Sequence, residues 1–232
     1  MKITVKGAKM LRGSLTPPGD KSTSHRAAIL NVLASGNSKV ENFSPGQDCA
    51  STVHCLREMG ASILADPLTP NSLLIEGTAN SLSEPASILD AGNSGTTMRL
   101  LSGVLAGQYF PSVISGDKSL NSRPMARIIQ PLKLMGANVS GRNNDTLAPI
   151  MFRGGRLSGI EYELPVASAQ LKSCLLLAGM YANGTTKIIE PTPSRDHTEK
   201  MLADMGVPLT IKDQVITVGQ GKLKAKNIFV PS

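Results

Sequence analysis

Three polar clusters recur along the chain, each placed where an apolar stretch of helical spacing begins. The clusters are Lys21–Ser24, Asn93–Thr97 and Ser168–Gln170. Their serines Ser22, Ser94 and Ser168 are 72 and 74 residues apart, so the clusters follow a repeat. The first turn of a helix carries amide N–H groups without partners and a partial positive charge, which together attract anions. The sequence therefore predicts that three helix starts meet at one anion-binding site.

Basic side chains accompany these helix starts and would strengthen the attraction for an anion. They are Lys21, Arg26, Arg99, Arg123, Lys172 and Arg195. The same residues also have a plainer interpretation, because Ser22 or Ser24 is an ordinary N-cap residue and surface arginines are usually solvated. Capping and ligand binding are compatible, so both interpretations stay open at this point.

A second repeat marks the ends of the helices that complete each unit. Its members are Met59-Gly60-Ala61, Met135-Gly136-Ala137 and Met205-Gly206-Val207, spaced 76 and 70 residues apart. Each follows an apolar-periodic stretch and precedes a strand-like run, and glycine here supplies the left-handed backbone that ends a helix. The pattern helix, strand, helix, strand, strand thus occurs three times between about residues 20 and 220. We expect one pseudo-threefold α/β domain built from three repeated units.

The composition limits the class of partner. A net charge of +7 and a pI near 9.5 indicate an anionic partner. Aromatic residues make up 3% of the chain and tryptophan is absent, so the stacking surfaces typical of nucleic-acid binding are scarce. No apolar run approaches the ~18 residues of a membrane span. Three cysteines match neither a disulfide framework nor a close-spaced metal site, which is typical of a cytoplasmic protein. From the charge and the few aromatic residues, we expect the ligand to be a small phosphorylated molecule.

Five motifs resemble those of a known family, in the order and spacing of that family. They are "PGDKSTSHRA" at 18–27, "GNSGTTMR" at 92–99, "SRP" at 122–124, "SAQLKS" at 168–173 and "SRDHTEKML" at 194–202. Together they resemble the N-terminal half of the EPSP synthase (3-phosphoshikimate 1-carboxyvinyltransferase) family. The resemblance implies transfer of the enolpyruvyl group of phosphoenolpyruvate to the 5-hydroxyl of shikimate 3-phosphate, with release of phosphate, in the shikimate pathway of aromatic amino-acid biosynthesis. It implies a monomer with no cofactor or metal, and a target of glyphosate.

The resemblance also implies roles for individual residues. Those expected to bind shikimate 3-phosphate are Lys21, Ser22, Arg26, Ser168, Ala169, Gln170 and Ser194. Those expected to bind phosphoenolpyruvate are Lys21, Gly95, Arg123 and Gln170. Ala169 stands where some members have a second serine, so its contact could only be made by the backbone. Lys21 would position substrate, and the main acid/base group would belong to a second half of the enzyme.

The family fold implies boundaries for the domain and its parts. The expected fold is an inside-out α/β barrel of three β-α-β-α-β-β units. The units would span about 12–78, 79–156 and 157–228, within a substrate-binding domain at 12–228. Residues 1–11, with a first strand around Ile3–Val5, would pack with the second domain, and 229–232 would begin the crossover to it. We expect the chain to be inactive without that C-terminal domain, which would be its protein partner.

Two alternatives remain open. The sister enzyme that acts on UDP-N-acetylglucosamine shares the fold and the enolpyruvyl chemistry, but its hallmark is a cysteine five residues before the Arg-Pro pair. That position is Lys118 in this chain. The other alternative is a binding module that sequesters phosphorylated metabolites without catalysis.

Overall fold

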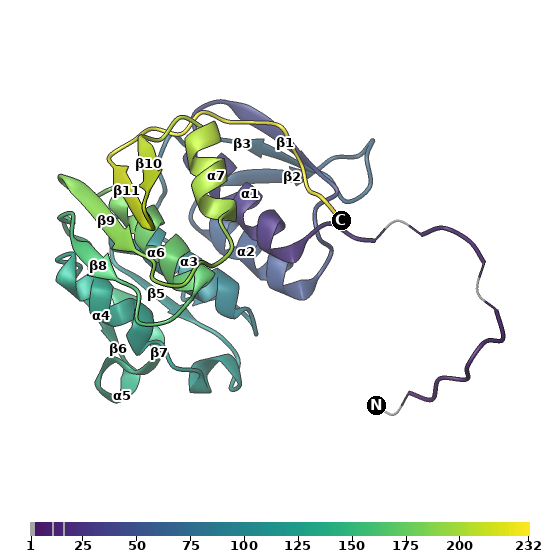
Figure 1. The fold of residues 1–232 in the computed structure, drawn as a ribbon, viewed down its shortest axis with the longest axis horizontal. Coiled ribbons are helices and arrows are strands. Elements are labelled where there is room, and N and C mark those ends of the chain that lie inside the picture. The colour runs from purple at the N-terminus through teal and green to yellow at the C-terminus, as the bar shows by residue number, and fades with distance from the viewer. Residues whose placement is uncertain (1–2, 11, 16) are drawn as a thin grey trace.

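A computed structural model describes residues 3–10, 12–15 and 17–232 (Figure 1). The rest of the expected N-terminal segment, Met1, Lys2 and Leu11, lies outside the described residues. Residues 3–10 form neither helix nor strand, and they run along an exposed path away from the other elements (Figure 1). The side chains of Ile3 and Val5 are 74% and 85% exposed. The strand that the resemblance pairs with the second domain, around Ile3–Val5, is therefore not formed in this chain by itself.

Three central helices begin at the polar clusters. They are α1 (Lys21–Leu33), α3 (Gly95–Ala106) and α6 (Ala169–Gly179). In α1 every residue of 24–33 is buried, and in α6 every residue of 171–179 is buried. Because these runs exceed two helical turns, both helices are covered on all sides.

Each of these helices has an N-cap residue whose side-chain oxygen accepts a hydrogen bond from an amide of the first turn. Ser94 Oγ and Ser168 Oγ accept hydrogen bonds from the amides of Thr97 and Leu171, at 3.1 and 3.3 Å. In α1 the cap is Asp20, whose carboxylate accepts the amide of Thr23 at 2.7 Å. The interpretation of Ser22 or Ser24 as the cap was therefore wrong, because Asp20, which directly precedes the helix, makes this bond. Ser22 is left free of the capping role.

The second helices end as the sequence predicts. These helices are α2 (Gln47–Glu58), α4 (Ala126–Leu134) and α7 (His197–Asp204). The glycines that follow them, Gly60, Gly136 and Gly206, have φ angles of +86°, +86° and +95°. This left-handed backbone is readily adopted only by glycine, so the prediction of three glycine-terminated helices is confirmed.

Three four-stranded sheets surround the helices, and all three have the same topology. The first contains β12 (Ile228–Phe229), β1 (Asn37–Glu41), β3 (Leu73–Glu76) and β2 (Ser62–Ala65), in this order. The second contains β4 (Leu89–Asp90), β5 (Ser112–Ser115), β7 (Leu147–Phe152) and β6 (Val139–Gly141). The third contains β8 (Glu161–Glu163), β9 (Thr185–Ile189), β11 (Val215–Gly219) and β10 (Leu209–Lys212). In each sheet the first pair of strands is parallel and the other two pairs are antiparallel. The prediction of three like α/β units is confirmed.

The first unit is completed by the other end of the chain. Strand β12 pairs in parallel with β1, with Ile228 opposite Val40. The amide of Asp20 also donates a 2.6 Å hydrogen bond to the carbonyl of Pro231. No strand was predicted here, and the domain boundary expected between 228 and 229 falls within β12. The C-terminal residues are therefore part of the structure that holds the start of α1.

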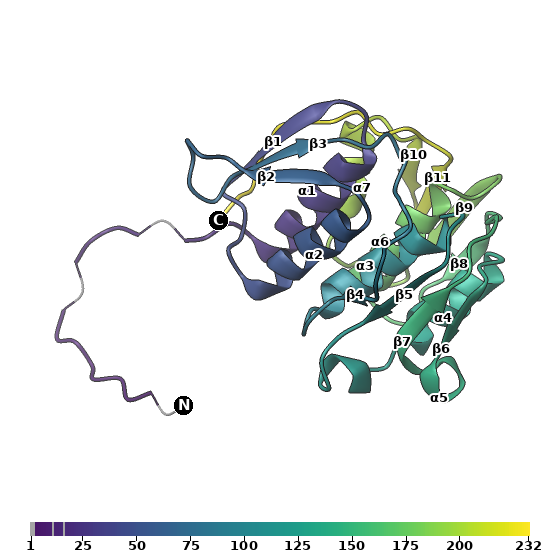
Figure 2. The same ribbon diagram turned by 180° about the vertical axis from the view of Figure 1, so that it is seen from behind.

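The core lies between the central helices and the inner faces of the sheets (Figures 1 and 2). Helices α3 and α6 pack directly against each other. A Cβ added to Gly103 would lie 2.2 Å from the carbonyl oxygen of Cys174, so this close approach requires glycine. Burial alternates along β11, as expected for a strand with one buried face. In the described part of the chain, no helix combines the length and the apolar character that crossing a membrane requires.

Candidate functional site

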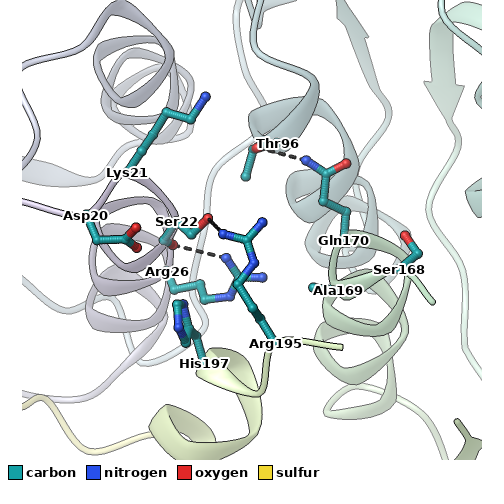
Figure 3. Close-up of a pocket in the computed structure, with 10 residues that line it drawn as sticks. All are labelled: Asp20, Lys21, Ser22, Arg26, Thr96, Ser168, Ala169, Gln170, Arg195 and His197. Carbon is teal, nitrogen blue, oxygen red and sulfur yellow. Dashed lines mark hydrogen bonds between the residues drawn. The ribbon is translucent and has the colours of Figure 1, made fainter. Parts of the chain in front are cut away.

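The starts of α1, α3, α6 and α7 meet at a cavity of about 510 Å³ (Figure 3). Its lining consists of Asp20, Lys21, Ser22, Arg26, Thr96, Ser168, Ala169, Gln170, Arg195 and His197. The predicted convergence of helix starts is therefore present, with α7 as a fourth contributor. The amides of these first turns and the basic side chains make the cavity suited to an anion.

Arg195 reaches across the cavity from the loop before α7. Its Nη1 donates a 3.2 Å hydrogen bond to Ser22 Oγ on α1 (Figure 3). The side chain is exposed, and this is the one hydrogen bond that its guanidinium makes within the described residues. A guanidinium has five N–H donors, so Arg195 retains donors for a bound anion.

Arg26 is held much more tightly. The residue is 4% exposed, and its Nε and Nη2 donate to Thr198 Oγ1 and Ser173 Oγ at 2.6 and 2.7 Å. Its Nη1 donates to the carbonyl of Ser22 at 3.0 Å. Burial lowers the pKa of Arg26 to about 10, and the negative charge of Glu199 opposes this shift. The guanidinium is therefore fixed in orientation, with two N–H donors left for the cavity.

Gln170 is oriented from both ends of its amide. Its Nε2 donates to Thr96 Oγ1 at 2.9 Å, and its Oε1 accepts a 2.8 Å bond from Arg99 Nη1. Burial lowers the pKa of Arg99, and the positive charges of Arg127 and Arg123 add to the shift. This side of the cavity therefore carries an excess of positive charge.

Gly95 and Arg123 lie beside the cavity rather than in its lining. A Cβ on Gly95 would lie 2.8 Å from Arg99 Nη1 and 3.3 Å from Arg123 Nη1. Arg123 is held by a hydrogen bond from its Nη2 to Asn93 Oδ1. The structure thus places two of the four predicted phosphoenolpyruvate residues, Gly95 and Arg123, together, next to Arg99 and adjoining the cavity at Thr96.

Lys21 and Ser194 have partners of their own. Lys21 lines the cavity, but its Nζ forms an exposed 3.0 Å ion pair with Asp48. Ser194 does not line the cavity, and its Oγ donates to Glu190 Oε1 at 2.5 Å. A ligand would have to compete with Asp48 for Lys21. The one hydroxyl proton of Ser194 is already engaged.

The inclusion of Lys172 among the anion-attracting side chains was wrong. Its Nζ is buried between Glu190 and Glu199, at 2.8 and 2.6 Å. Its side chain is 1% exposed. Two carboxylates already neutralise its positive charge, so it does not attract an anionic ligand.

Three lining residues were not predicted as site residues. Thr96 follows Gly95 inside the motif "GNSGTTMR", and its hydroxyl accepts the hydrogen bond from Gln170 at the edge of the cavity. Asp20 and His197 flank the starts of α1 and α7. The position next to a helix start was the available signal for all three. Within the described ranges, no group of three or more histidine, cysteine or acidic residues could hold a metal ion.

Comparison with known proteins gives one consistent result. The family model of EPSP synthase (3-phosphoshikimate 1-carboxyvinyltransferase) matches residues 5–232. A 3-phosphoshikimate 1-carboxyvinyltransferase from Desulforamulus reducens is 49% identical over 233 residues, covering 100% of this chain and 54% of the relative. The relative with the same description from Bacillus pumilus is 48% identical over 223 residues, covering 95% of this chain and 51% of its own.

A solved structure agrees with these matches. The EPSP synthase from Acinetobacter baumannii superposes with a TM-score of 0.90 at 46% identity. The match covers 95% of this chain and 50% of that structure. The chain spans about half the length of the curated relatives it matches.

Proposed function

The chain belongs to the EPSP synthase family, and we propose that it carries the shikimate 3-phosphate site and part of the phosphoenolpyruvate site of an enolpyruvyl transfer. One observation carries the proposal, namely the convergence of separate motifs on a single cavity at helix starts. The converging residues are Lys21, Ser22, Arg26, Ser168, Ala169 and Gln170. Both substrates are anions, which matches the donors and charges of this cavity.

The phosphate of shikimate 3-phosphate would be bound mainly by guanidinium and hydroxyl donors. Arg195 keeps free N–H donors in the cavity, and Ser22 and Ser168 bring hydroxyls from two helix starts. Ala169 has no polar side chain, so only its backbone amide can contribute. Gln170 and Lys21 would then bind polar groups of the shikimate ring.

Phosphoenolpyruvate would lie toward the start of α3. Gly95 is the first residue of this helix, so its amide has no helical partner and can donate to an anion. The absence of a side chain there lets a ligand approach the backbone closely. Arg123 supplies a cation beside it, and Gln170 and Lys21 lie between the two substrate positions.

The reaction needs groups beyond these. The 5-hydroxyl of shikimate 3-phosphate gives up its proton to a base as its oxygen bonds to C2 of phosphoenolpyruvate, while C3 takes up a proton from an acid. Loss of phosphate from C2 and of a proton from C3 then restores the double bond. We assign these proton transfers to a second half of the enzyme, as in the family, and give Lys21 the role of positioning substrate. Closure of that half over the cavity would expel water and align the two substrates.

The two alternatives, the UDP-N-acetylglucosamine enzyme and a non-catalytic binding module, have less support than the proposed function. Lys118 stands where the enzyme for UDP-N-acetylglucosamine has its cysteine, and the relatives named above are all 3-phosphoshikimate 1-carboxyvinyltransferases. A binding module without chemistry would show a reading frame that ends near Ser232, whereas an enzyme would continue into a second half. The three cysteines are free and buried, which suits the cytoplasm proposed for this protein.

Titration of the chain tests the proposal directly. We expect shikimate 3-phosphate to bind weakly, because the open cavity leaves its charges in contact with water and salt. UDP-N-acetylglucosamine should not bind. Binding of UDP-N-acetylglucosamine in place of shikimate 3-phosphate would move the chain to the sister enzyme.

A phosphate-release assay with both substrates tests whether the proton-transfer groups belong to the second half of the enzyme. We expect no turnover from residues 1–232 alone, because a proton-transfer group must lie within about 3 Å of the reacting atom and is assigned to the other half. Adding the second half of a relative as a separate chain should restore some turnover. Sustained turnover by the chain alone, abolished in Lys21→Ala, would place the chemistry in this half instead.

A further inference from the structure

A buried ionic cluster lies behind the cavity wall formed by α6 and α7. Lys172 Nζ on α6 lies 2.8 Å from Glu190 Oε2 and 2.6 Å from Glu199 Oε1. The three side chains are 1%, 9% and 2% exposed. Burying ions in this way costs desolvation energy, so the cluster persists only because each lysine–glutamate contact is well made. Such a cluster is stiff and can set the position of what is attached to it.

The loop that carries Arg195 is attached to this cluster through Ser194. The two carboxylate oxygens of Glu190 have different partners. Oε2 contacts Lys172, and Oε1 contacts the loop. Oε1 accepts the Ser194 amide at 2.9 Å and the Ser194 hydroxyl at 2.5 Å. The residue that follows is Arg195, which crosses the cavity to Ser22.

A second set of contacts ties α6 to α7. Ser173 Oγ and Thr198 Oγ1 are 2.6 Å apart, and each also accepts a bond from the Arg26 guanidinium. Glu199, one residue further along α7, is bound to Lys172 of α6. The start of α6, with Gln170, and the loop before α7 are therefore held in one fixed relation.

We propose that Lys172, Glu190 and Ser194 are positioning residues that hold Arg195 in the cavity for the phosphate of the substrate. Ser194 then acts on the phosphate through Arg195, and not by the direct contact that the family resemblance implies. The reason is that its hydroxyl proton is given to Glu190 and that its side chain does not line the cavity. The ligand side of this inference rests on the proposed function.

A double-mutant cycle on the 232-residue chain tests the inference. Shikimate 3-phosphate is titrated into the chain and binding is followed by NMR, which detects weak complexes. We expect Ser194→Ala and Glu190→Gln each to weaken binding about tenfold, the range of one charge-assisted hydrogen bond. In an Arg195→Ala background, Ser194→Ala should have little further effect, because the residue that it positions is already gone.

A matched control separates positioning from general damage. Like Glu190, Glu161 pairs with a lysine, and Glu161→Gln removes this carboxylate from β8, but its ion pair with Lys187 of β9 is exposed to solvent. It should leave binding unchanged. Thermal unfolding of each variant reports whether it folds, and if Glu190→Gln does not, the Ser194→Ala cycle decides.

Hydrogen exchange of the ligand-free chain provides a second readout that needs no substrate. The amides of 194–196 should exchange faster in Ser194→Ala and Glu190→Gln, and not in Glu161→Gln. Unchanged exchange there would overturn the positioning role whatever the ligand is. A full effect of Ser194→Ala in the Arg195→Ala background would overturn it too, since that result means direct contact. If exchange rises as expected but the chain does not bind shikimate 3-phosphate, the proposed function fails and the positioning of Arg195 stands.

Discussion

Two groups of basic side chains lie in or around the cavity, on α1, on α6 and in the loops before α4 and α7, and they differ in what balances their charge. The interior group consists of Arg26 and Lys172, both buried and bound to protein groups on several sides. The rim group consists of Lys21, Arg123 and Arg195, each exposed or half-buried and held by one contact. Basic residues that accompany the same helix starts thus differ in role, because the interior group is bound within the protein and the rim group is accessible to a ligand.

The physical basis of the difference is solvation. A buried ion that loses its partner has no water to replace it, so the cost is several kcal/mol. An exposed ion that loses its partner is resolvated, and the cost is at most about 1 kcal/mol. Substitutions in the interior group should therefore act mainly on the free energy of unfolding, whatever they also do to binding, and those at the rim mainly on ligand affinity.

The largest effect is expected at Lys172. Lys172→Met leaves Glu190 and Glu199 facing each other without a cation, and the free energy of unfolding should fall by about 3–5 kcal/mol. The matched control is Lys187→Met, whose ion pair with Glu161 is 50% and 62% exposed. That change should cost less than about 1 kcal/mol. Urea unfolding of both variants provides the measurement, and equal losses would erase the distinction between interior and rim.

His25 extends the comparison to a buried basic side chain without a carboxylate partner. Burial lowers its pKa to about 4, although the charge of Asp48 opposes the shift and those of Lys21 and Arg26 add to it. Between about pH 6.5 and 4, the unfolded chain binds a proton that the native chain does not, so stability falls as the pH falls. The full loss is about 3 kcal/mol.

The measurement is the free energy of unfolding at pH 7 and near pH 4.5 in the native chain and in His25→Asn. The variant keeps a polar group toward Thr52, the hydrogen-bond partner of the ring at 2.6 Å, but does not titrate here. Its stability should change much less over this interval. Carboxyls with lowered pKa, such as Asp66 and Asp117, lose their contribution at lower pH and do not blur the window. Identical pH dependence in the two proteins would contradict the assignment.

Arg123 tests the rim. Arg123→Ala removes a charge-assisted donor, and affinity for phosphoenolpyruvate should fall by about 1.5–3 kcal/mol, or roughly 10- to 150-fold. The chain combined with a relative's second half is the suitable protein, and steady-state kinetics give the KM for each substrate. The free energy of unfolding should stay within about 0.5 kcal/mol of the native value. A loss confined to shikimate 3-phosphate would mean that Arg123 belongs to the other substrate.

The sequence predicted what repeats and missed what depends on burial. The glycines after α2, α4 and α7 recur in register, and the three like units follow from them. Strand β12 was missed because only two residues pair and because its partner β1 lies almost the whole chain away. No local pattern records such a contact.

The site shows the same division. Seven residues singled out from the sequence line one cavity because they lie at or near helix starts, which a sequence reveals. The burial of Lys172 between two carboxylates was not predicted, because Glu190 and Glu199 come from later segments that only the fold brings against α6. The hydrogen bond from the Ser194 hydroxyl to Glu190 was missed for another reason, because the three residues between them form no helix or strand whose periodicity would pair the two side chains. Residue type shows what a side chain can bind, whereas burial and partners decide what it does bind.

Lys21 lies at the boundary between the two groups, and its partner Asp48 offers the finest test. The ion pair is 3.0 Å long with side chains 55% and 30% exposed, so it is worth about 0.2–1 kcal/mol. If Lys21 is a rim residue, a bound anion must compete with Asp48 for its ammonium group. Asp48→Asn should then raise the affinity for shikimate 3-phosphate by about two- to fivefold.

Salt and a control variant make this small effect interpretable. The gain should shrink at high ionic strength, because both the ion pair and the ligand contact are exposed. Asp66→Asn, which removes one of the two carboxylate partners of Lys39 away from the cavity, should not change affinity. A small loss of stability is expected in Asp48→Asn, since Asp48 also lies in the first turn of α2, where a negative charge is favourable. If affinity fell instead of rising, Asp48 would be holding Lys21 in place for the ligand, much as Glu190 is proposed to hold the Arg195 loop. Lys21 would then be a rim cation that depends on a fixed partner, and exposure alone would no longer separate the two groups.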